Sequence, residues 1–339
     1  MAKEVKLSLV FRDMWQSAGK YQPRVDQLVK VAPKIIEMGC FDRVETNGGG
    51  FEQVNLLYGE NPNTSVRQWT KPFHEAGIQT HMLDRALNGL RMFPCSKDLR
   101  KLFYKVKKAQ GTDITRIFCG LNDARNVIPS IQYAKEAGMI AQASLCITFS
   151  PIHTVEYYVN LAKELEKMGT HILGIKDMAG LIKPYAATKL IKALKDEIGI
   201  PVHLHTHDTS GNGVATLLRA ADAGVDIVDT AISSVSGVTS QPSLNAIVSA
   251  LAGQERDTGI DINGLNPLAN YWETVRTYYS GFESDLKTGT AEVYYNEIPG
   301  GQYSNFRPQG EGVGLADKWE ECKKMYHDVN DLFGDVIKV

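Results

Sequence analysis

Glycine recurs along the chain at the ends of stretches with an amphipathic helical pattern, and the regular spacing of these glycines limits the folds open to the sequence. Glycine suits the end of a helix because it tolerates the left-handed backbone in which many helices end. Successive glycines lie 25 to 38 residues apart, which is the length of one strand and one helix joined by short loops. The eight positions are Gly39, Gly77, Gly111, Gly138, Gly169, Gly199, Gly224 and Gly253.

Short runs rich in apolar and β-branched residues occur where this period places strands. They lack the clean alternation of apolar and polar residues that marks a half-exposed strand. This absence is typical of strands that are buried on both faces of a parallel sheet. The sequence therefore predicts an α/β fold, a closed (β/α)8 or TIM barrel, with a doubly wound open sheet as the alternative. The predicted strands are residues 6–11, 42–46, 78–83, 116–121, 140–148, 172–176, 202–207 and 227–233.

The repeat stops near residue 254, which predicts a barrel over residues 1–253 and a C-terminal helical extension over residues 254–339. In the extension, two stretches with a helical pattern, 266–279 and 315–331, flank a Gly/Pro/Asn-rich segment at 297–314. We expect the extension to pack on the barrel and to complete the active site.

Composition and charge exclude several classes of protein. With 43% hydrophobic and 22% charged residues among 339, the chain has ordinary globular usage. Its net charge of −2 argues against nucleic acid as a partner. The five widely spaced cysteines, Cys40, Cys95, Cys119, Cys146 and Cys322, form no CxxC pair, which favours reduced thiols in a cytoplasm. Because no secretion signal or apolar run of about 18 residues is present, we expect a cytoplasmic protein.

His203, His205 and His207 alternate along the seventh predicted strand, so their side chains share one face. Active sites of such barrels lie at the carboxyl ends of the strands, which makes His205 and His207 the better metal ligands. Two imidazoles and a carboxylate suit Zn²⁺, Co²⁺ or Mn²⁺ and leave an open coordination position. Asp13, at the end of the first predicted strand, supplies that carboxylate, or else it caps a helix or pairs with Arg12.

Lys176 ends the hydrophobic run "HILGIKD" of the sixth predicted strand. At that position its amine points into the mouth of the barrel or pairs with Asp177. Burial lowers the pKa of a lysine. From the residues alone, a structural ion pair is the simpler interpretation.

Five segments of the sequence resemble, in order and spacing, the carboxyltransferase domain of the biotin-dependent pyruvate carboxylases, of transcarboxylase and of the oxaloacetate decarboxylase α subunit. The resemblance covers nearly the whole chain. The segments are "FRDMWQS", "GIKDMAGLIKPYAA", "PVHLHTHDTSGNGVAT", "GVDIVDTAISSVSGVTSQPS" and "EIPGGQYSNFRPQ".

This resemblance implies a divalent metal, Zn, Co or Mn, bound by Asp13, His205, His207 and a carbamylated Lys176. Carbamylation makes chemical sense because it turns an amine, which cannot bind a cation while protonated, into an anionic oxygen donor. The enzyme would be a biotin-dependent carboxyltransferase of the pyruvate carboxylase or oxaloacetate decarboxylase type. It would move a carboxyl group between carboxybiotin and a 2-oxo acid, pyruvate or oxaloacetate, through a metal-assisted enolate.

The resemblance also assigns the substrate-binding and proton-transfer residues. Arg12, Gln16 and Arg85 match the positions that hold the 2-oxo acid, and a guanidinium can bind both oxygens of its carboxylate. Ser304 stands where the family usually has threonine, whose hydroxyl moves a proton between the pyruvate methyl and the biotin ring nitrogen. The catalytic residues would be Ser304, Lys176 and Arg12. Without the resemblance, Ser304 is a turn residue in a polar loop.

Three segments depart from the family pattern, so a 2-oxo acid other than pyruvate, or a reduced activity, stays open. Trp15 replaces the histidine of "RDAHQS", residues 83–86 read "LDRA" in place of "LLRG", and residues 47–52 read "NGGGFE" in place of "WGGATFD". The sequence contains no biotinyl-lysine "AMKM" motif. We therefore expect biotin on a separate carrier domain or subunit, and we expect a homo-oligomer, a dimer.

Two alternatives remain open at this stage. Metal-dependent aldol-type lyases and acyl-CoA condensing enzymes are related barrels that share the Arg-Asp and H-x-H motifs but lack the lysine ligand. A non-catalytic scaffold subunit of a biotin complex is the other.

Overall fold

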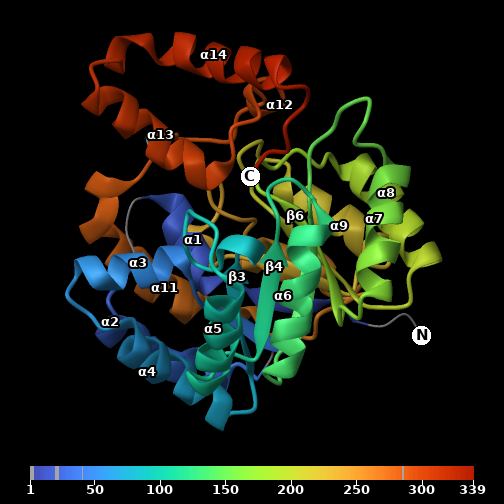
Figure 1. The fold of residues 1–339 in the computed structure, drawn as a ribbon. Helices are drawn as coiled ribbons and strands as arrows, with labels where there is room; N and C mark the ends of the chain where they lie inside the picture. Colours follow the sequence, from blue (N-terminus) through green and yellow to red (C-terminus); the bar gives the residue numbers. More distant parts are fainter. Residues whose placement is uncertain (1–3, 20–22, 40, 285) are drawn as a thin grey trace.

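Eight parallel strands close into a barrel in the order β1 to β8, and β1 pairs with β8 through the register Lys6↔Ile227 to Leu9↔Thr230. The computed structural model describes residues 4–19, 23–39, 41–284 and 286–339. Closure of the sheet confirms the barrel and excludes the open-sheet alternative (Figure 1). The strands are β1 Lys6–Leu9, β2 Arg43–Gly48, β3 Gln79–Asp84, β4 Ile114–Phe118, β5 Ile140–Cys146, β6 Ile172–Asp177, β7 Val202–Thr206 and β8 Ile227–Thr230.

Helices surround the strands, and the last two, α13 and α14, lie together beyond one end of the barrel (Figure 1). Short 3₁₀ turns are η1 Ala86–Asn88, η2 Ser233–Val235, η3 Ser280–Phe282 and η4 Ala316–Lys318. The α-helices are α1 Phe11–Ala18, α2 Val25–Glu37, α3 Gly49–Leu57, α4 Pro62–Glu75, α5 Lys97–Ala109, α6 Ala124–Glu136, α7 Val155–Lys167, α8 Pro184–Glu197, α9 Gly213–Asp222, α10 Leu244–Leu251, α11 Ile262–Tyr279, α12 Val293–Asn296, α13 Gly300–Gly312 and α14 Trp319–Leu332. Within the described residues, no helix has the length and apolar character needed to cross a membrane.

Seven of the eight recurring glycines have the left-handed backbone expected after a helix, with φ between +62° and +96°. Gly199 is the exception, because α8 ends in the extended residue Ile198. The amide of Gly199 donates to Glu166 Oε1 at 2.8 Å. The period therefore located the helices correctly, although this helix ends by a different geometry.

Five of the eight strands, β1, β4, β5, β7 and β8, end earlier than predicted at the mouth, the end of the barrel where their carboxyl ends meet, whereas β2, β3 and β6 extend one or two residues further. The first strand stops at Leu9, and the amide of Met14 donates to the carbonyl of Val10 at 2.9 Å to start α1. Arg12 and Asp13 therefore lie in the first turn of a helix and not at the end of a strand. The same shortening places His207 one residue beyond β7.

The Gly/Pro/Asn-rich segment contradicts the expectation of a polar loop, because residues 300–312 form the helix α13. Tertiary contacts outweigh the weak helix propensity of its glycines and proline. The amide of Gly300 donates to the carbonyl of Met178 at 2.8 Å, and Tyr303 and Phe306 each pack against Trp319 with ring centroids 5.4 Å apart.

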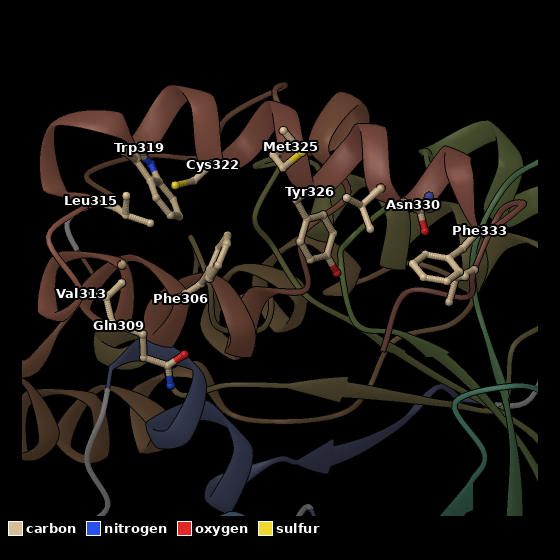
Figure 2. Close-up of a pocket in the computed structure, with 13 residues that line it drawn as sticks. Phe306, Gln309, Val313, Leu315, Trp319, Cys322, Met325, Tyr326, Asn330 and Phe333 are labelled. Atoms are coloured by element: carbon tan, nitrogen blue, oxygen red, sulfur yellow. The ribbon is translucent and has the colours of Figure 1, made fainter.

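An apolar groove of about 580 Å³ lies between α13 and α14 (Figure 2). Phe306, Trp319 and Tyr326 line it, and none of the predicted site residues does. The extension is also joined to the barrel at α11, where Trp272 packs against Phe11 and Trp15. Because α11 shares the barrel core, the boundary at residues 253/254 stays a prediction.

Candidate active site at the mouth of the barrel

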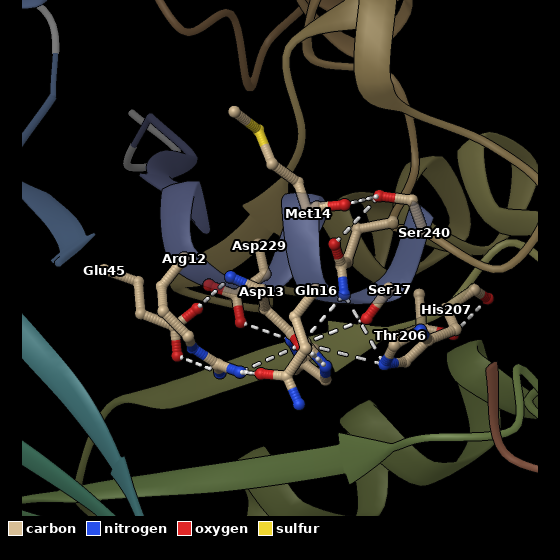
Figure 3. Close-up of polar contacts among 12 residues, drawn as sticks. Arg12, Asp13, Met14, Gln16, Ser17, Glu45, Thr206, His207, Asp229 and Ser240 are labelled. Carbon is tan, nitrogen blue, oxygen red and sulfur yellow. Dashed lines mark hydrogen bonds and ion pairs between the residues drawn. The ribbon is translucent and has the colours of Figure 1, made fainter. Parts of the chain in front are cut away.

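Asp13, His205 and His207 meet at the mouth, with one ligand-type atom from each within 4.8 Å of the others. His205 Nε2 lies 3.4 Å and His207 Nε2 lies 3.7 Å from Asp13 Oδ2. Figure 3 shows Asp13 and His207 among the polar contacts of this region. The first turn of α1 and the end of β7 therefore supply one cluster of nitrogen and oxygen donors.

The two histidines are held so that Nε2 of each faces Asp13. His205 Nδ1 bonds to Asp229 Oδ2 at 2.7 Å, and His207 Nδ1 bonds to the carbonyl of Thr239 at 2.8 Å. Each Nδ1 must carry the proton, because both partners are acceptors, which leaves a lone pair on Nε2. Burial lowers the pKa of His205 to about 3 and also lowers the pKa of His207, so both rings are neutral.

This donor set fits a divalent metal. Among the described residues, His205 Nε2 is buried without a hydrogen-bond partner, an arrangement that costs free energy unless a ligand is supplied. Burial by itself would raise the pKa of Asp13, but Arg12 and the neighbouring histidines outweigh it and hold this pKa far below its ordinary value. An anionic carboxylate and two neutral imidazoles are the ligands that Zn²⁺, Co²⁺ and Mn²⁺ accept.

Lys176 lies beside this cluster, paired in register with His205 across β6 and β7. Burial, together with Arg116 and Arg12, lowers the pKa of its amine to about 8, although Asp13 partly opposes the shift. The expected alternative, an ion pair with Asp177, is not formed. The Asp177 carboxylate instead accepts the amides of Leu181 and Ile182, both at 2.8 Å, and the Lys176 Nζ lies 5.3 Å from the ring of Phe118.

Three charged residues inside the barrel, Glu45, Arg116 and Asp229, were missed in the sequence. Glu45 accepts from Arg12 Nη2 at 2.7 Å and from the amide of Asp13 at 3.2 Å. Asp229 accepts from Arg116 at 2.6 Å and from two histidines of β7. The sequence did offer an indication of their role, because each lies within a strand that was predicted to be fully buried, where a charged residue is unexpected. These residues position Arg12, Asp13 and His205.

Gln241 and His203 complete the surroundings of the cluster. Gln241 Nε2 donates to Asp13 Oδ2 at 2.8 Å, a contact that the sequence did not predict. His203 lies deeper in the barrel, where its Nε2 bonds to Asp229 at 2.7 Å and its Nδ1 to Gln142 at 3.1 Å. The structure therefore separates His203 from His205 and His207 as a structural residue.

The predicted substrate-binding residues Arg12, Gln16 and Arg85 lie next to the cluster. Arg12 Nη1 donates to the side-chain oxygen of Gln16, and Arg85 Nη1 donates to the carbonyl of Leu90 at 2.9 Å. Burial and the charge of Arg12 lower the pKa of Arg85. The nearby carboxylate of Asp84 partly opposes this shift, but its side chain bonds to Tyr104 and Thr115, so the partly buried guanidinium of Arg85 is suited to a carboxylate ligand.

Ser304 is buried in α13, and its hydroxyl donates to the carbonyl of Gly301 at 3.2 Å. The first residue of this helix lies against His207 on the side of Nδ1, since a methyl group on Gly300 would lie 2.7 Å from that atom. Ser304 follows one turn later. The helix therefore begins beside His207, and no described contact joins the hydroxyl of Ser304 to Asp13, Lys176 or Arg12.

Two of the three departures from the family pattern face away from the mouth. Trp15 is buried against Trp272, with ring centroids 4.9 Å apart, and Asp84 accepts from Tyr104 at 2.5 Å and from Thr115 at 3.1 Å. Only the glycine run at 48–50 borders the substrate-binding residues.

The cysteines of the described residues are free thiols. They are Cys95, Cys119, Cys146 and Cys322, and Cys40 lies outside the described residues.

If Asp13, His205 and His207 bind a metal, His207→Ala should lower the affinity for Co²⁺ by roughly 100-fold or more, because one of three neutral or anionic donors is removed. Titration with Co²⁺, followed by its visible absorption, measures this loss. His171→Ala is the control, since that ring bonds to the amide of Ala141 far from the cluster. Equal Co²⁺ affinity in His207→Ala and the native protein would contradict the assignment.

Two sequence families match the chain. One, described as HMGL-like, matches residues 121–271, and the other, described as a conserved carboxylase domain, matches residues 293–339. The curated pyruvate carboxylase of Staphylococcus aureus is 44% identical over 340 residues, which cover 97% of this chain and 29% of that protein. That of Bacillus subtilis is 41% identical, with the same coverage of both chains. The chain thus spans less than a third of the length of these relatives.

The fold matches solved structures equally well. The carboxyl transferase domain of Rhizobium etli pyruvate carboxylase with pyruvate superposes with a TM-score of 0.97 at 38% identity, covering 99% of this chain and 58% of that one. The same domain with oxamate and biotin gives a TM-score of 0.96. The sequence and the barrel with its C-terminal helices agree in this match. The chain therefore belongs with the carboxyltransferase domains of the pyruvate carboxylase family.

Proposed function

We propose that this protein is a carboxyltransferase that moves a carboxyl group between biotin, held on a separate carrier domain or subunit, and a small 2-oxo acid such as pyruvate or oxaloacetate. One observation carries the proposal. Lys176 is buried without a carboxylate partner among the described residues and lies beside the possible metal ligands Asp13, His205 and His207, which Arg12, Gln16 and Arg85 border. One relative, the Rhizobium etli domain whose structures contain pyruvate or oxamate and biotin, shares the fold at 38% identity. Lyases of related barrels lack the lysine.

The residues that would hold the metal are Asp13, His205, His207 and Lys176, the last as its carbamate. Carbamylation requires a neutral amine. At a pKa of about 8, about a tenth of the amine is neutral at pH 7, compared with roughly one part in 3,000 at 10.5. When bound, Zn²⁺, Co²⁺ or Mn²⁺ would act as a Lewis acid that polarises the 2-oxo group of the acceptor.

The chain's own residues bind the acceptor and move its proton. Arg12 and Arg85 hold the carboxylate, and their positive charge stabilises negative charge that develops on the acceptor. The hydroxyl of Ser304 takes a proton from the acceptor's methyl group and passes it to the ring nitrogen of biotin. The N–C bond of the carboxybiotin breaks as the new C–C bond forms, and the reverse sequence decarboxylates oxaloacetate.

The partner and the setting of the enzyme belong to the same proposal. The biotin carrier would approach the mouth of the barrel, because the possible metal ligands Asp13, His205 and His207 lie there and we assign the proton transfer to Ser304 of the helix that begins beside them. We expect the enzyme to be a homodimer. We expect it in the cytoplasm because the described cysteines are free thiols.

The proposal is tested by exchange of ¹⁴C between labelled 2-oxo acids and their carboxylated forms, with metal-loaded protein and free biotin or a biotinylated carrier. We expect exchange that requires both biotin and metal. Biotin-independent cleavage or condensation would favour the aldol-type lyase or the acyl-CoA condensing enzyme. Binding of a biotinylated carrier without any turnover would favour the non-catalytic scaffold.

Replacing Arg85 with lysine should raise KM for the 2-oxo acid by about ten- to a hundredfold, because one ammonium cannot reproduce the two parallel hydrogen bonds of a guanidinium. Steady-state kinetics on several 2-oxo acids measure the effect. Arg91→Lys, on the exposed loop after η1, is the matched control. Unchanged kinetics of Arg85→Lys with every acid would refute the role of Arg85.

A further inference from the structure

Two glycines at the start of α3 lie directly against the predicted substrate-binding side chains. A methyl group on Gly50 would lie 2.8 Å from Gln16 Nε2 and closer still to the rest of the amide. A methyl group on Gly49 would lie 3.2 Å from Arg85 Cζ and 3.2 Å from the carbonyl oxygen of Leu90, and closer to Arg85 Nη1. The amide of Gln16 and the guanidinium of Arg85 therefore fill the space that side chains at these positions would occupy.

The backbone does not require glycine at either position. Gly48, which precedes them, has φ +152° and needs to be glycine, but Gly49 and Gly50 are absent from the residues with positive φ. Within a helix, alanine is favoured over glycine by about 1 kcal/mol. The two glycines thus reduce the stability of α3, and the three atoms that would lie nearest to a methyl group on Gly50 all belong to Gln16.

We propose that Gly49 and Gly50 are positioning residues of the acceptor pocket, an inference that rests on the proposed function. Without side chains, they let Gln16 and Arg85 come close to Arg12. The oxygen of Gln16 already accepts from Arg12, so its NH₂ group is left to donate. Arg85 is anchored by Leu90. The three side chains together present guanidinium and amide donors to the carboxylate and 2-oxo oxygens of a 2-oxo monocarboxylic acid.

The test is Gly50→Ala in the full chain, with pyruvate binding measured by calorimetry on metal-loaded protein without biotin. We expect the Kd for pyruvate to rise about tenfold or more, as for the loss of one hydrogen bond to a charged group. The Tm and the metal content should not fall. In the exchange assay, KM should rise while kcat changes by less than about threefold. Gly264→Ala, in the first turn of α11 and 3.6 Å from Met38 Cε, is the matched control.

A double-mutant cycle with Gln16→Ala separates this mechanism from a general disturbance. If Gly50→Ala acts by displacing Gln16, it should have no further effect on the Kd once Gln16 is alanine, so the two losses should not add. The double variant should fold even if Gly50→Ala alone does not, because the collision is gone. Additive losses, an unchanged Kd in Gly50→Ala, or a misfolded double variant would overturn the inference.

The inference and the proposed function fail in different ways. If native protein binds no 2-oxo acid, both are overturned. If native protein binds pyruvate and catalyses exchange while Gly50→Ala binds pyruvate equally well, only the role of the glycines is overturned.

Discussion

Replacing Lys176 with alanine should abolish carboxyl transfer and remove the metal together. The residue is buried, is paired in register with His205 and contributes to the charge environment of Asp13. Loss of one anionic ligand, and with it the Lewis acid, should lower kcat/KM by on the order of 10³-fold or more. Elemental analysis and the exchange assay measure the two losses.

The controls for this variant separate metal binding from folding. Lys176→Met keeps a long uncharged chain in the buried site and should fold, yet it should also lose metal, because its side chain cannot form the anionic oxygen ligand of a carbamate. Lys183→Ala removes an exposed lysine after the same strand and should retain full activity. In native protein supplied with ¹³C-bicarbonate, we expect a carbamate carbon signal that disappears in Lys176→Ala. Full activity in Lys176→Arg would contradict carbamylation, since a guanidinium cannot form this ligand.

Replacing Ser304 with alanine should abolish transfer while the metal content and the fold stay unchanged. A group that moves a proton in the transition state typically contributes about 10² to 10⁴-fold to the rate, so the loss should far exceed that of a structural hydroxyl. Ser304→Thr keeps the hydroxyl and should stay active. The exchange assay, with Tm and metal analysis in parallel, measures these effects.

Ser280→Ala is the matched control, because Ser280 makes the same type of bond, to the carbonyl of Thr277 three residues earlier at 3.1 Å. That variant should transfer carboxyl groups normally. Near-normal biotin-dependent transfer by Ser304→Ala would show that another group moves the proton. The choice between transferase, lyase and scaffold would then depend on Lys176 alone.

The architecture could be predicted from the sequence because its physical causes are local. A strand and a helix of fixed length, each ending in residues suited to that end, repeat along the chain, and eight such units can bury their apolar faces by closing into a barrel. The same regularity places chemistry at the strand ends. His205 and His207 were identified in this way, whereas Lys176 was proposed as a ligand only through the family resemblance, and the structure places all three near Asp13 at one mouth.

The positions of strand ends were predicted less well, and the reason is also local. The first strand gives way to α1 two residues before the predicted end, because a backbone hydrogen bond from Met14 to Val10 competes with pairing in the sheet. Arg12 and Asp13 consequently lie on a helix, in which successive side chains point in different directions around the axis, and not on a strand, in which they alternate between two faces. One turn of α1 therefore directs Asp13 to the metal cluster, Arg12 to Glu45, and Ser17 to Asp13.

By itself, the sequence determined the barrel, the identity of the ligand-type residues and the order in which they follow one another. Only the tertiary structure decided that residues 300–312 form a helix that begins beside His207, that Glu45, Arg116 and Asp229 link the site inside the barrel, and that Gly49 and Gly50 border Gln16 and Arg85. Each of these features depends on contacts between segments far apart in the chain. Periodicity and propensity describe neighbours along the chain, and so they carry no information about which distant side chain will fill a given space.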